Sequence, residues 1–171
     1  NVDSGVDYRL RTLEQAELYH FPLDGSAQSS LQKSFDSLIA DEAHIEKNVN
    51  VEILGREIPA LAVCDDIAWF DFYDLCDGPR SQNDYIELGR LFHAVLISNV
   101  PVMGTKNDDL ARRYINLIDE FYDRGVKVIM SADAEIHNIY GTGRLEFEFQ
   151  RTTSRMLEMQ SHDYLAREHK A

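Results

Sequence analysis

The amino-acid sequence predicts an α/β fold, a mixed sheet containing a parallel β–α–β unit, with an N-terminal hairpin and a C-terminal amphipathic helix. Residues 94–97 form a continuous apolar run, which is typical of a strand buried on both faces. A long amphipathic segment, 108–124, follows, and a second apolar run occupies 126–130. A strand, a helix and a strand joined by short connections imply parallel strands and a right-handed crossover.

Residues 108–124 form the clearest predicted helix. At about 100° per residue, its apolar side chains gather on one arc and its charged side chains occupy the other. The apolar arc consists of Leu110, Ala111, Tyr114, Ile115, Leu117, Ile118, Phe121 and Tyr122. Gly125 follows the last turn, where a glycine commonly ends a helix in the left-handed conformation.

Residues 49–63 predict the hairpin. Apolar and polar side chains alternate over 49–54, Gly55 and Arg56 make a turn, and residues 58–63 return. Residues 67–72 predict a further strand. A helix is predicted next, and the polar stretch 81–84 marks where it begins.

The two ends of the chain give weaker patterns. Residues 1–10 are interpreted as a strand end running into a turn, and a helix is expected to begin at Ser29 or Ser30. Residues 145–149 alternate and predict a strand with one polar face. Residues 152–167 predict the final amphipathic helix, and 168–171 a frayed tail.

Composition limits the possible functions. The chain has 171 residues, 44% of them hydrophobic, which is enough for one domain with a core. A net charge of −13 disfavours nucleic acid and anionic membranes as partners. No apolar stretch approaches the roughly 20 residues of a membrane span. Two cysteines, Cys64 and Cys76, do not make a disulfide framework, and Cys64 is expected to be a buried free thiol.

The sequence gives no catalytic residues and no metal ligands to assign. It contains no phosphate-binding G-x-x-x-x-G-K-S/T loop, and Gly141 with Gly143 favours a turn. Asp133, Glu135 and His137 lie close together but lack an established metal-ligand spacing, so no metal is expected. An independent enzyme would need a convergent cluster of titratable groups, and none is visible.

The arginines leave alternatives open. Arg112 and Arg113 lie on the polar edge of the clearest helix, where they can pair locally or contact a nucleotide phosphate or a neighbouring subunit. Arg151 and Arg155 are four residues apart and therefore share one helix face. Two like charges at this spacing indicate an anionic partner, which is either an internal carboxylate or an external group.

Several short stretches, taken in order, resemble the C-terminal region of the ZapE-type AAA+ ATPases, whose mitochondrial relatives are the Afg-type ATPases. They span nearly the whole chain, with the weakest resemblance over 13–67. They include D-Y-R at Asp7, Tyr8 and Arg9. The matching stretches are residues 1–12, 81–86, 90–93, 99–103, 111–115, 119–122, 147–151, 154–155, 158–161 and 164–165.

This resemblance implies a cell-division-associated ATPase that uses ATP and Mg²⁺ in its full-length form. The chain begins with Asn1 and not with Met, so we expect a fragment whose Walker A, Walker B, sensor 1 and arginine-finger residues precede it. Residues 1–12 would end the upstream ATPase core, and 13–171 would form a C-terminal α/β domain. The fragment itself is expected to bind neither ATP nor metal.

The resemblance also implies a cytoplasmic protein, the division protein FtsZ as a partner, and a possible homo-oligomer. Arg9, Arg113 and Arg155 are the candidates for nucleotide-sensing or interface residues. The alternative function is a non-catalytic protein-binding or regulatory module, which the acidic composition and the lack of an active site within the chain favour.

Overall fold

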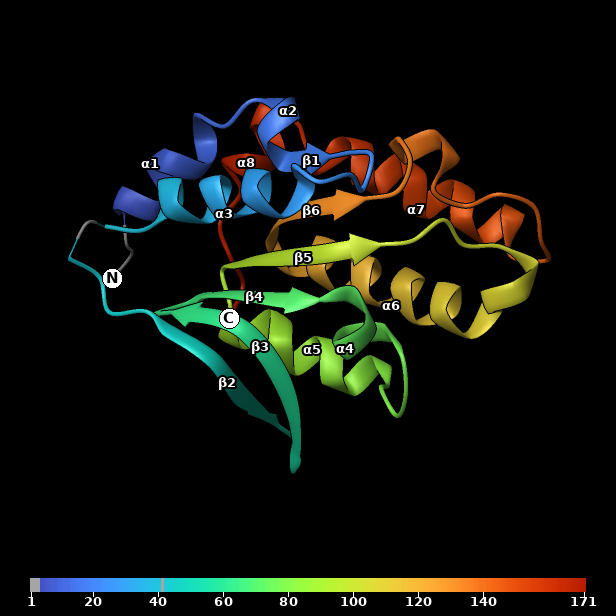
Figure 1. Cartoon of the computed structure of the whole chain (residues 1–171), viewed down its shortest axis with the longest axis horizontal. Helices are drawn as coiled ribbons and strands as arrows, with labels where there is room; N and C mark the ends of the chain where they lie inside the picture. Colours follow the sequence, from blue (N-terminus) through green and yellow to red (C-terminus); the bar gives the residue numbers. More distant parts are fainter. Residues whose placement is uncertain (1–3, 41) are drawn as a thin grey trace.

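The computed structural model describes residues 4–40 and 42–171, with side chains described from Tyr8 onward, and contains a six-stranded mixed sheet with helices on both faces (Figure 1). The strand order is β1-β6-β5-β4-β3-β2. The first four strands in this order are mutually parallel, and β3 runs antiparallel to both of its neighbours, β4 and β2. The strands are β1 (Tyr19–His20), β2 (Glu46–Ile53), β3 (Arg56–Cys64), β4 (Ile67–Asp71), β5 (Ala94–Val100) and β6 (Lys127–Ala132).

Eight α-helices and two short 3₁₀ turns occur in the described part of the chain. The 3₁₀ turns are Thr105–Asn107 and Ile136–Asn138. The helices are α1 (Ser4–Arg11), α2 (Gln15–Leu18), α3 (Ala27–Leu38), α4 (Phe72–Cys76), α5 (Gln82–Leu91), α6 (Asp108–Arg124), α7 (Glu146–Glu158) and α8 (His162–Leu165).

Each face of the sheet has its own hydrophobic core. One core joins the sheet to α4, α5, α6 and α7, and its strand residues include Ala68, Phe70, Val95, Ile97, Val128 and Met130. The other joins the sheet to α1 and α3, and its strand residues include Ala62, Cys64, Ile67, Trp69, Ala94, Leu96 and Ile129. Consecutive residues of β5 thus point into opposite cores, as the continuous apolar run predicts.

The predicted β–α–β unit is confirmed. Strands β5 and β6 are parallel, with Val95 opposite Val128, and α6 joins them. Helix α6 has the bounds that the sequence predicts. Gly125 ends it with a φ of 68°, and its N–H donates to the carbonyls of Phe121 and Tyr122.

The predicted hairpin is also confirmed and is tied to the rest of the fold by an ion pair. Strands β2 and β3 pair antiparallel around Leu54 and Gly55, which both have positive φ. Arg56 at the start of β3 donates to both carboxylate oxygens of Asp84, at 2.6 and 2.5 Å. Asp84 is completely buried and also accepts from the Ser81 N–H at the start of α5.

Three expectations for the ends of the chain are wrong. Ser4–Arg11 is a helix and not a strand end, while residues 1–3 of that prediction lie outside the described residues. Helix α3 follows Ser26, three residues before Ser29. Residues 145–149 lead into and begin α7 instead of forming a strand, because Phe149 packs in the core while Phe147 is 82% exposed.

The predicted C-terminal helix over 152–167 starts earlier and is interrupted. Helix α7 ends at Glu158, and α8 begins at His162 after a turn. The following tail is anchored and not frayed: Lys127, which is buried, donates to the carbonyl of Arg167 at 2.5 Å. The backbone N–H of Lys170 donates to the carbonyl of Arg124 at 2.8 Å.

His93 is buried, which agrees with the interpretation of it as a packed or solvated residue. It lies between α5 and β5, and its ring meets that of His169 edge-on at 5.2 Å. His169 contacts the carbonyl of Gly89 at 2.6 Å.

Both buried cysteines are free thiols, as expected for Cys64. Within residues 4–40 and 42–171, no helix is long and apolar enough to cross a membrane.

We expect Asp84→Ala to lower the free energy of unfolding by about 2 kcal/mol, because it leaves Arg56 and the first turn of α5 without their shared carboxylate. Urea denaturation measures this change. Asp109→Ala is the matched control, since Asp109 is an exposed acid in the first turn of α6 and should cost less than about 1 kcal/mol. Equal losses in the two variants would contradict this role for Asp84.

Candidate functional site

The three candidate arginines lie in three separate places. Arg9 on α1 donates to the carbonyl of Leu38 at the end of α3, at 3.2 Å. Arg113 on α6 donates to the carbonyl of Cys76 at the end of α4, also at 3.2 Å. Among the described residues, no hydrogen bond or ion pair joins two of these arginines. The fold therefore does not bring them together into a single site.

Arg155 has the internal acidic partner that its spacing from Arg151 suggests. Its Nη1 donates to Oδ1 of Asp119 on α6, at 2.6 Å. Arg151 donates to the other carboxylate oxygen at 3.3 Å. The Arg155 side chain is 26% exposed and that of Arg151 is 62% exposed. The two guanidinium groups therefore share one carboxylate, that of Asp119.

Aromatic rings hold these cations in position. The Arg155 guanidinium lies over the Tyr122 ring, 4.8 Å from its centroid. Arg167 lies 5.1 Å from the Tyr122 centroid and 4.9 Å from that of Tyr164, while Tyr122 and Tyr164 are stacked at 5.8 Å. Lys127 lies 5.2 Å from the Tyr164 centroid. The cations therefore alternate with rings between α6, α7 and the tail, which fixes their geometry.

The phenol groups of this stack have raised pKa values. The Tyr122 hydroxyl donates to Glu158 at 2.7 Å, and this hydrogen bond raises the pKa of Tyr122. Burial raises the pKa of Tyr164, whose hydroxyl donates to the carbonyls of Phe121 and Val126. Both phenols therefore remain neutral donors that position the surrounding elements.

Arg113 lines an open groove of about 570 Å³ between the segments that follow β4 and β5. Ligands of open α/β sheets commonly bind outside the carboxyl ends of the parallel strands. The residues lining the groove are Asp77, Gly78, Thr105, Lys106, Asn107, Asp108, Asp109, Leu110 and Arg113. The groove therefore lies where a nucleotide would be expected in such a fold.

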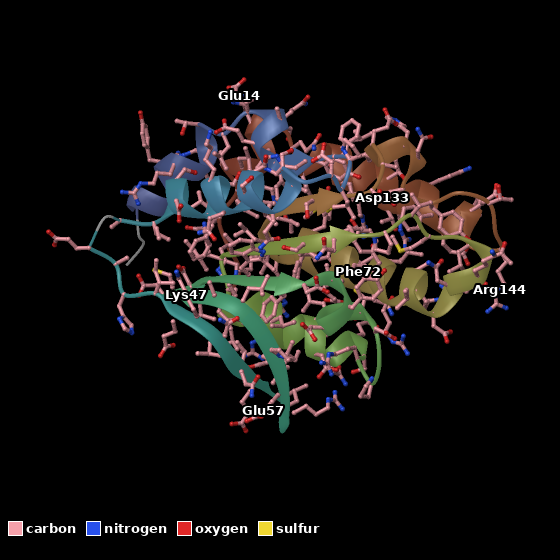
Figure 2. The ribbon with its side chains drawn as sticks, viewed as in Figure 1. Glu14, Lys47, Glu57, Phe72, Asp133 and Arg144 are labelled. Carbon is pink, nitrogen blue, oxygen red and sulfur yellow. The ribbon has the colours of Figure 1, made fainter. Side chains whose placement is uncertain are left out.

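The charges of this groove do not suit a nucleotide triphosphate. Asp108 and Asp109 occupy the first turn of α6, where they neutralise the positive end of the helix dipole. Their carboxylates would repel a phosphate that approached the same N–H groups. Arg144 donates to Asp108 at 2.8 Å and lies at one extremity of the molecule (Figure 2). The cations Lys106 and Arg113 are thus surrounded by acids.

The glycine pair forms a closed turn, as predicted. The N–H of Gly141 donates to the carbonyl of Met103 at 2.7 Å, and the N–H of Gly143 donates to the Glu146 carboxylate at 3.2 Å. The N–H of Thr105 donates to the carbonyl of Thr142 at 3.0 Å. Since the glycine N–H groups are already used, this loop does not cradle phosphates. The residues described here therefore do not fit ATP and Mg²⁺.

Other reactive side chains are engaged in structure. Glu135 accepts from the backbone N–H of His137 at 3.1 Å, and no group of three potential metal ligands occurs among the residues that the structure describes. Burial raises the pKa of the Cys76 thiol to about 12. A thiol with that pKa is not a nucleophile at neutral pH.

The sequence interpretation missed a polar network at the carboxyl ends of three parallel strands. The Asn99 side chain donates to Asp71 at 2.6 Å, and its backbone N–H donates to the Ser131 hydroxyl at 2.9 Å. Asn99 has a φ of 68°, a left-handed conformation that asparagine tolerates. The sequence feature that could have indicated this network is the position of the three polar residues, which all lie at the ends of apolar runs.

Comparison with known proteins gives a consistent result. A family profile described as "AFG1-like ATPase" matches residues 1–168. "Cell division protein ZapE" of Escherichia coli K12 is 46% identical over 171 residues, covering 100% of this chain and 45% of that protein. "Lactation elevated protein 1 homolog B" of Danio rerio is 30% identical over 197 residues, covering 96% of this chain and 39% of that protein.

The chain therefore spans less than half the length of these curated relatives. "Uncharacterized protein C115.02c" of Schizosaccharomyces pombe is 30% identical over 145 residues, covering 85% of this chain and 32% of that protein. No solved structure matches.

We expect the chain not to bind Mg-ATP, because the N–H groups of Gly141 and Gly143 are engaged and the first turn of α6 is acidic. Isothermal titration calorimetry of the chain with Mg-ATP should give only heats of dilution. An established ATP-binding protein in the same buffer is the positive control. Binding at one site per chain with a micromolar dissociation constant would contradict this expectation.

Proposed function

The chain belongs to the AFG1-like ATPase family, and we propose that it is the C-terminal part of a cell-division-associated ATPase. The observation that carries the proposal is the family match over residues 1–168. The relative with 46% identity is named as a cell division protein, and this chain covers 45% of it. ATP and Mg²⁺ would be bound by the part of the protein that these 171 residues do not include.

The occupied N–H groups of Gly141 and Gly143 support this division of labour. In ATPases of this class a Walker A loop holds the phosphates, Mg²⁺ neutralises charge, and an arginine stabilises the transition state. This chain would complete or regulate such a unit. Residues 1–12 would belong to the end of the ATPase core and 13–171 to a C-terminal α/β domain.

Arg155 is our candidate for a residue that responds to the nucleotide state through an interface. Asp119 and Tyr122 fix its guanidinium, and the adjacent Arg151 is largely exposed. An anionic group from another domain or subunit would meet two cations that share one carboxylate. Arg9 and Arg113 remain further candidates, although each already donates to a backbone carbonyl.

We also propose FtsZ as a partner, a cytoplasmic location and assembly into a homo-oligomer. These follow from the resemblance and are consistent with the printed name of the Escherichia coli relative. The second candidate function is a non-catalytic protein-binding or regulatory module. It is favoured by exposed apolar side chains, notably Phe147 at 82% and Phe21 at 52% exposure.

We expect Arg155→Ala in the full-length protein to lower the ATPase rate or nucleotide-dependent assembly at least several-fold. Stability should fall by only about 1 kcal/mol, because Asp119 keeps its contact with Arg151. Steady-state ATP hydrolysis, sedimentation and thermal denaturation measure these three properties.

Arg112→Ala is the matched control for this substitution. Arg112 is 51% exposed and lies 3.8 Å from Glu148, so its loss should leave hydrolysis and stability nearly unchanged. Unchanged hydrolysis and assembly in Arg155→Ala would reject the interface role. A large loss of stability would show instead that Arg155 serves mainly the internal ion pair.

A further inference from the structure

A groove of about 330 Å³, lined by apolar and polar side chains, lies on the side of the molecule opposite the β2–β3 hairpin. It is formed by α2, the residue after β1, the turn after β6 and the end of α7. Its apolar lining residues include Tyr19, Phe21, Ile136 and Leu157. Gln160, in the turn after α7, also lines it. These segments are distant in sequence, so the groove exists only in the folded chain.

Two large apolar side chains of this groove are exposed. Phe21 is 52% exposed and Leu157 is 40% exposed, although both are large apolar side chains. The Phe21 ring packs against Tyr19, with centroids 5.9 Å apart, and the Tyr19 hydroxyl donates to the carbonyl of Ala134 at 2.5 Å. An apolar surface on a rigid base is typical of a binding site.

A small cavity of about 20 Å³ adjoins the groove, with which it shares Tyr19, Ile136 and Gln160. Three methionines line it, Met130, Met156 and Met159. Methionine side chains are unbranched and repack readily around different apolar groups. The cavity has room for about one water-sized group, and only repacking of its methionines would enlarge it.

The charges around the groove are acidic. Glu135 lines it beside His137, whose ring Nδ1 lies 3.5 Å from the Glu135 carboxylate, and Glu14 and Glu17 are exposed on either side of the lining residues of α2. Figure 2 shows Glu14 at the outer edge of the molecule. No lysine or arginine is among the described lining residues, and the whole chain carries a net charge of −13. Such a field attracts basic partners and repels acidic ones.

We propose that this groove binds a short segment of a partner protein that places one large apolar side chain between Phe21 and Leu157 and carries lysine or arginine on both sides of it. The apolar surface selects the anchor, and the acidic surroundings select the flanking charges. This interaction requires no nucleotide, so it holds whether or not the proposed ATPase function is correct.

A second copy of the chain is a poor occupant. Its most exposed large apolar residue is Phe147, which lies between Glu146 and Glu148. If Phe147 of one copy entered the groove of another, these carboxylates would approach Glu135. The same acidity disfavours nucleic acids and anionic lipids.

Fluorescence anisotropy of labelled twelve-residue peptides tests the proposal with the whole chain. Each peptide has a central leucine, phenylalanine or tryptophan in a glycine–serine background, flanked on both sides by two lysines or by two glutamates. At least one lysine-flanked peptide should bind saturably, with a dissociation constant on the order of 10–100 μM. The corresponding glutamate-flanked peptide should bind at least tenfold more weakly.

Two substitutions separate the groove from the rest of the surface. Leu157→Asp should weaken binding of that peptide at least tenfold, and Glu135→Lys should weaken it several-fold. Leu91→Asp is the matched control: Leu91 is 45% exposed at the end of α5, does not line the groove, and should retain binding within twofold. Unchanged thermal denaturation confirms that each variant remains folded.

Four results would overturn the proposal. They are the absence of saturable binding by every lysine-flanked peptide, equal binding of lysine- and glutamate-flanked peptides, equal loss in Leu157→Asp and Leu91→Asp, and unchanged binding in Leu157→Asp. Self-association that Leu157→Asp abolishes and Leu91→Asp preserves, without peptide binding, would assign the groove to a second copy instead. Sedimentation velocity on the same variants detects that outcome.

Discussion

The burial of β5 and β6 on both faces is the constraint on which the rest of the structure depends. Val95 and Ile97 face one core, while Ala94 and Leu96 face the other. Apolar surface on both sides of a parallel ladder must be covered, so helices have to lie on each face. Helix α6 covers one face as the crossover of the β–α–β unit, and α3 covers the other. The groove beside Arg113 lies on segments that follow β4 and β5.

The sequence predicted those parts of the fold where two local signals agreed. Helix α6 combines a wide apolar arc with Gly125 at its end, and its bounds were correct. Residues 145–149 gave only a short alternation, which fits a strand and the start of a helix equally well. The helix is selected by Phe149, Thr152 and Met156, which are all buried at helical spacing. That choice depends on packing against residues distant in sequence, which a short pattern does not reveal.

The candidate sites were less accessible to sequence reasoning than the fold. Spacing predicted that Arg151 and Arg155 share an anionic partner, but the choice of Asp119 depends on how α6 packs against α7. Phe21 and Leu157 are 136 positions apart and line one groove in the fold, in which β1 lies beside β6 at the edge of the sheet. Neither a helical nor a strand periodicity in the sequence reveals that residues so distant lie together. A lone exposed phenylalanine or leucine is also unremarkable in a sequence, because many surface residues are apolar.

We propose that this chain completes or regulates an ATPase without itself holding the nucleotide. Photoaffinity labelling of the full-length protein with an azido-ATP analogue, followed by peptide mapping, tests it most directly. We expect competition by unlabelled ATP to remove labels only from peptides outside these 171 residues. A competed label in the turn around Gly141 and Gly143, or in the first turn of α6, would contradict it.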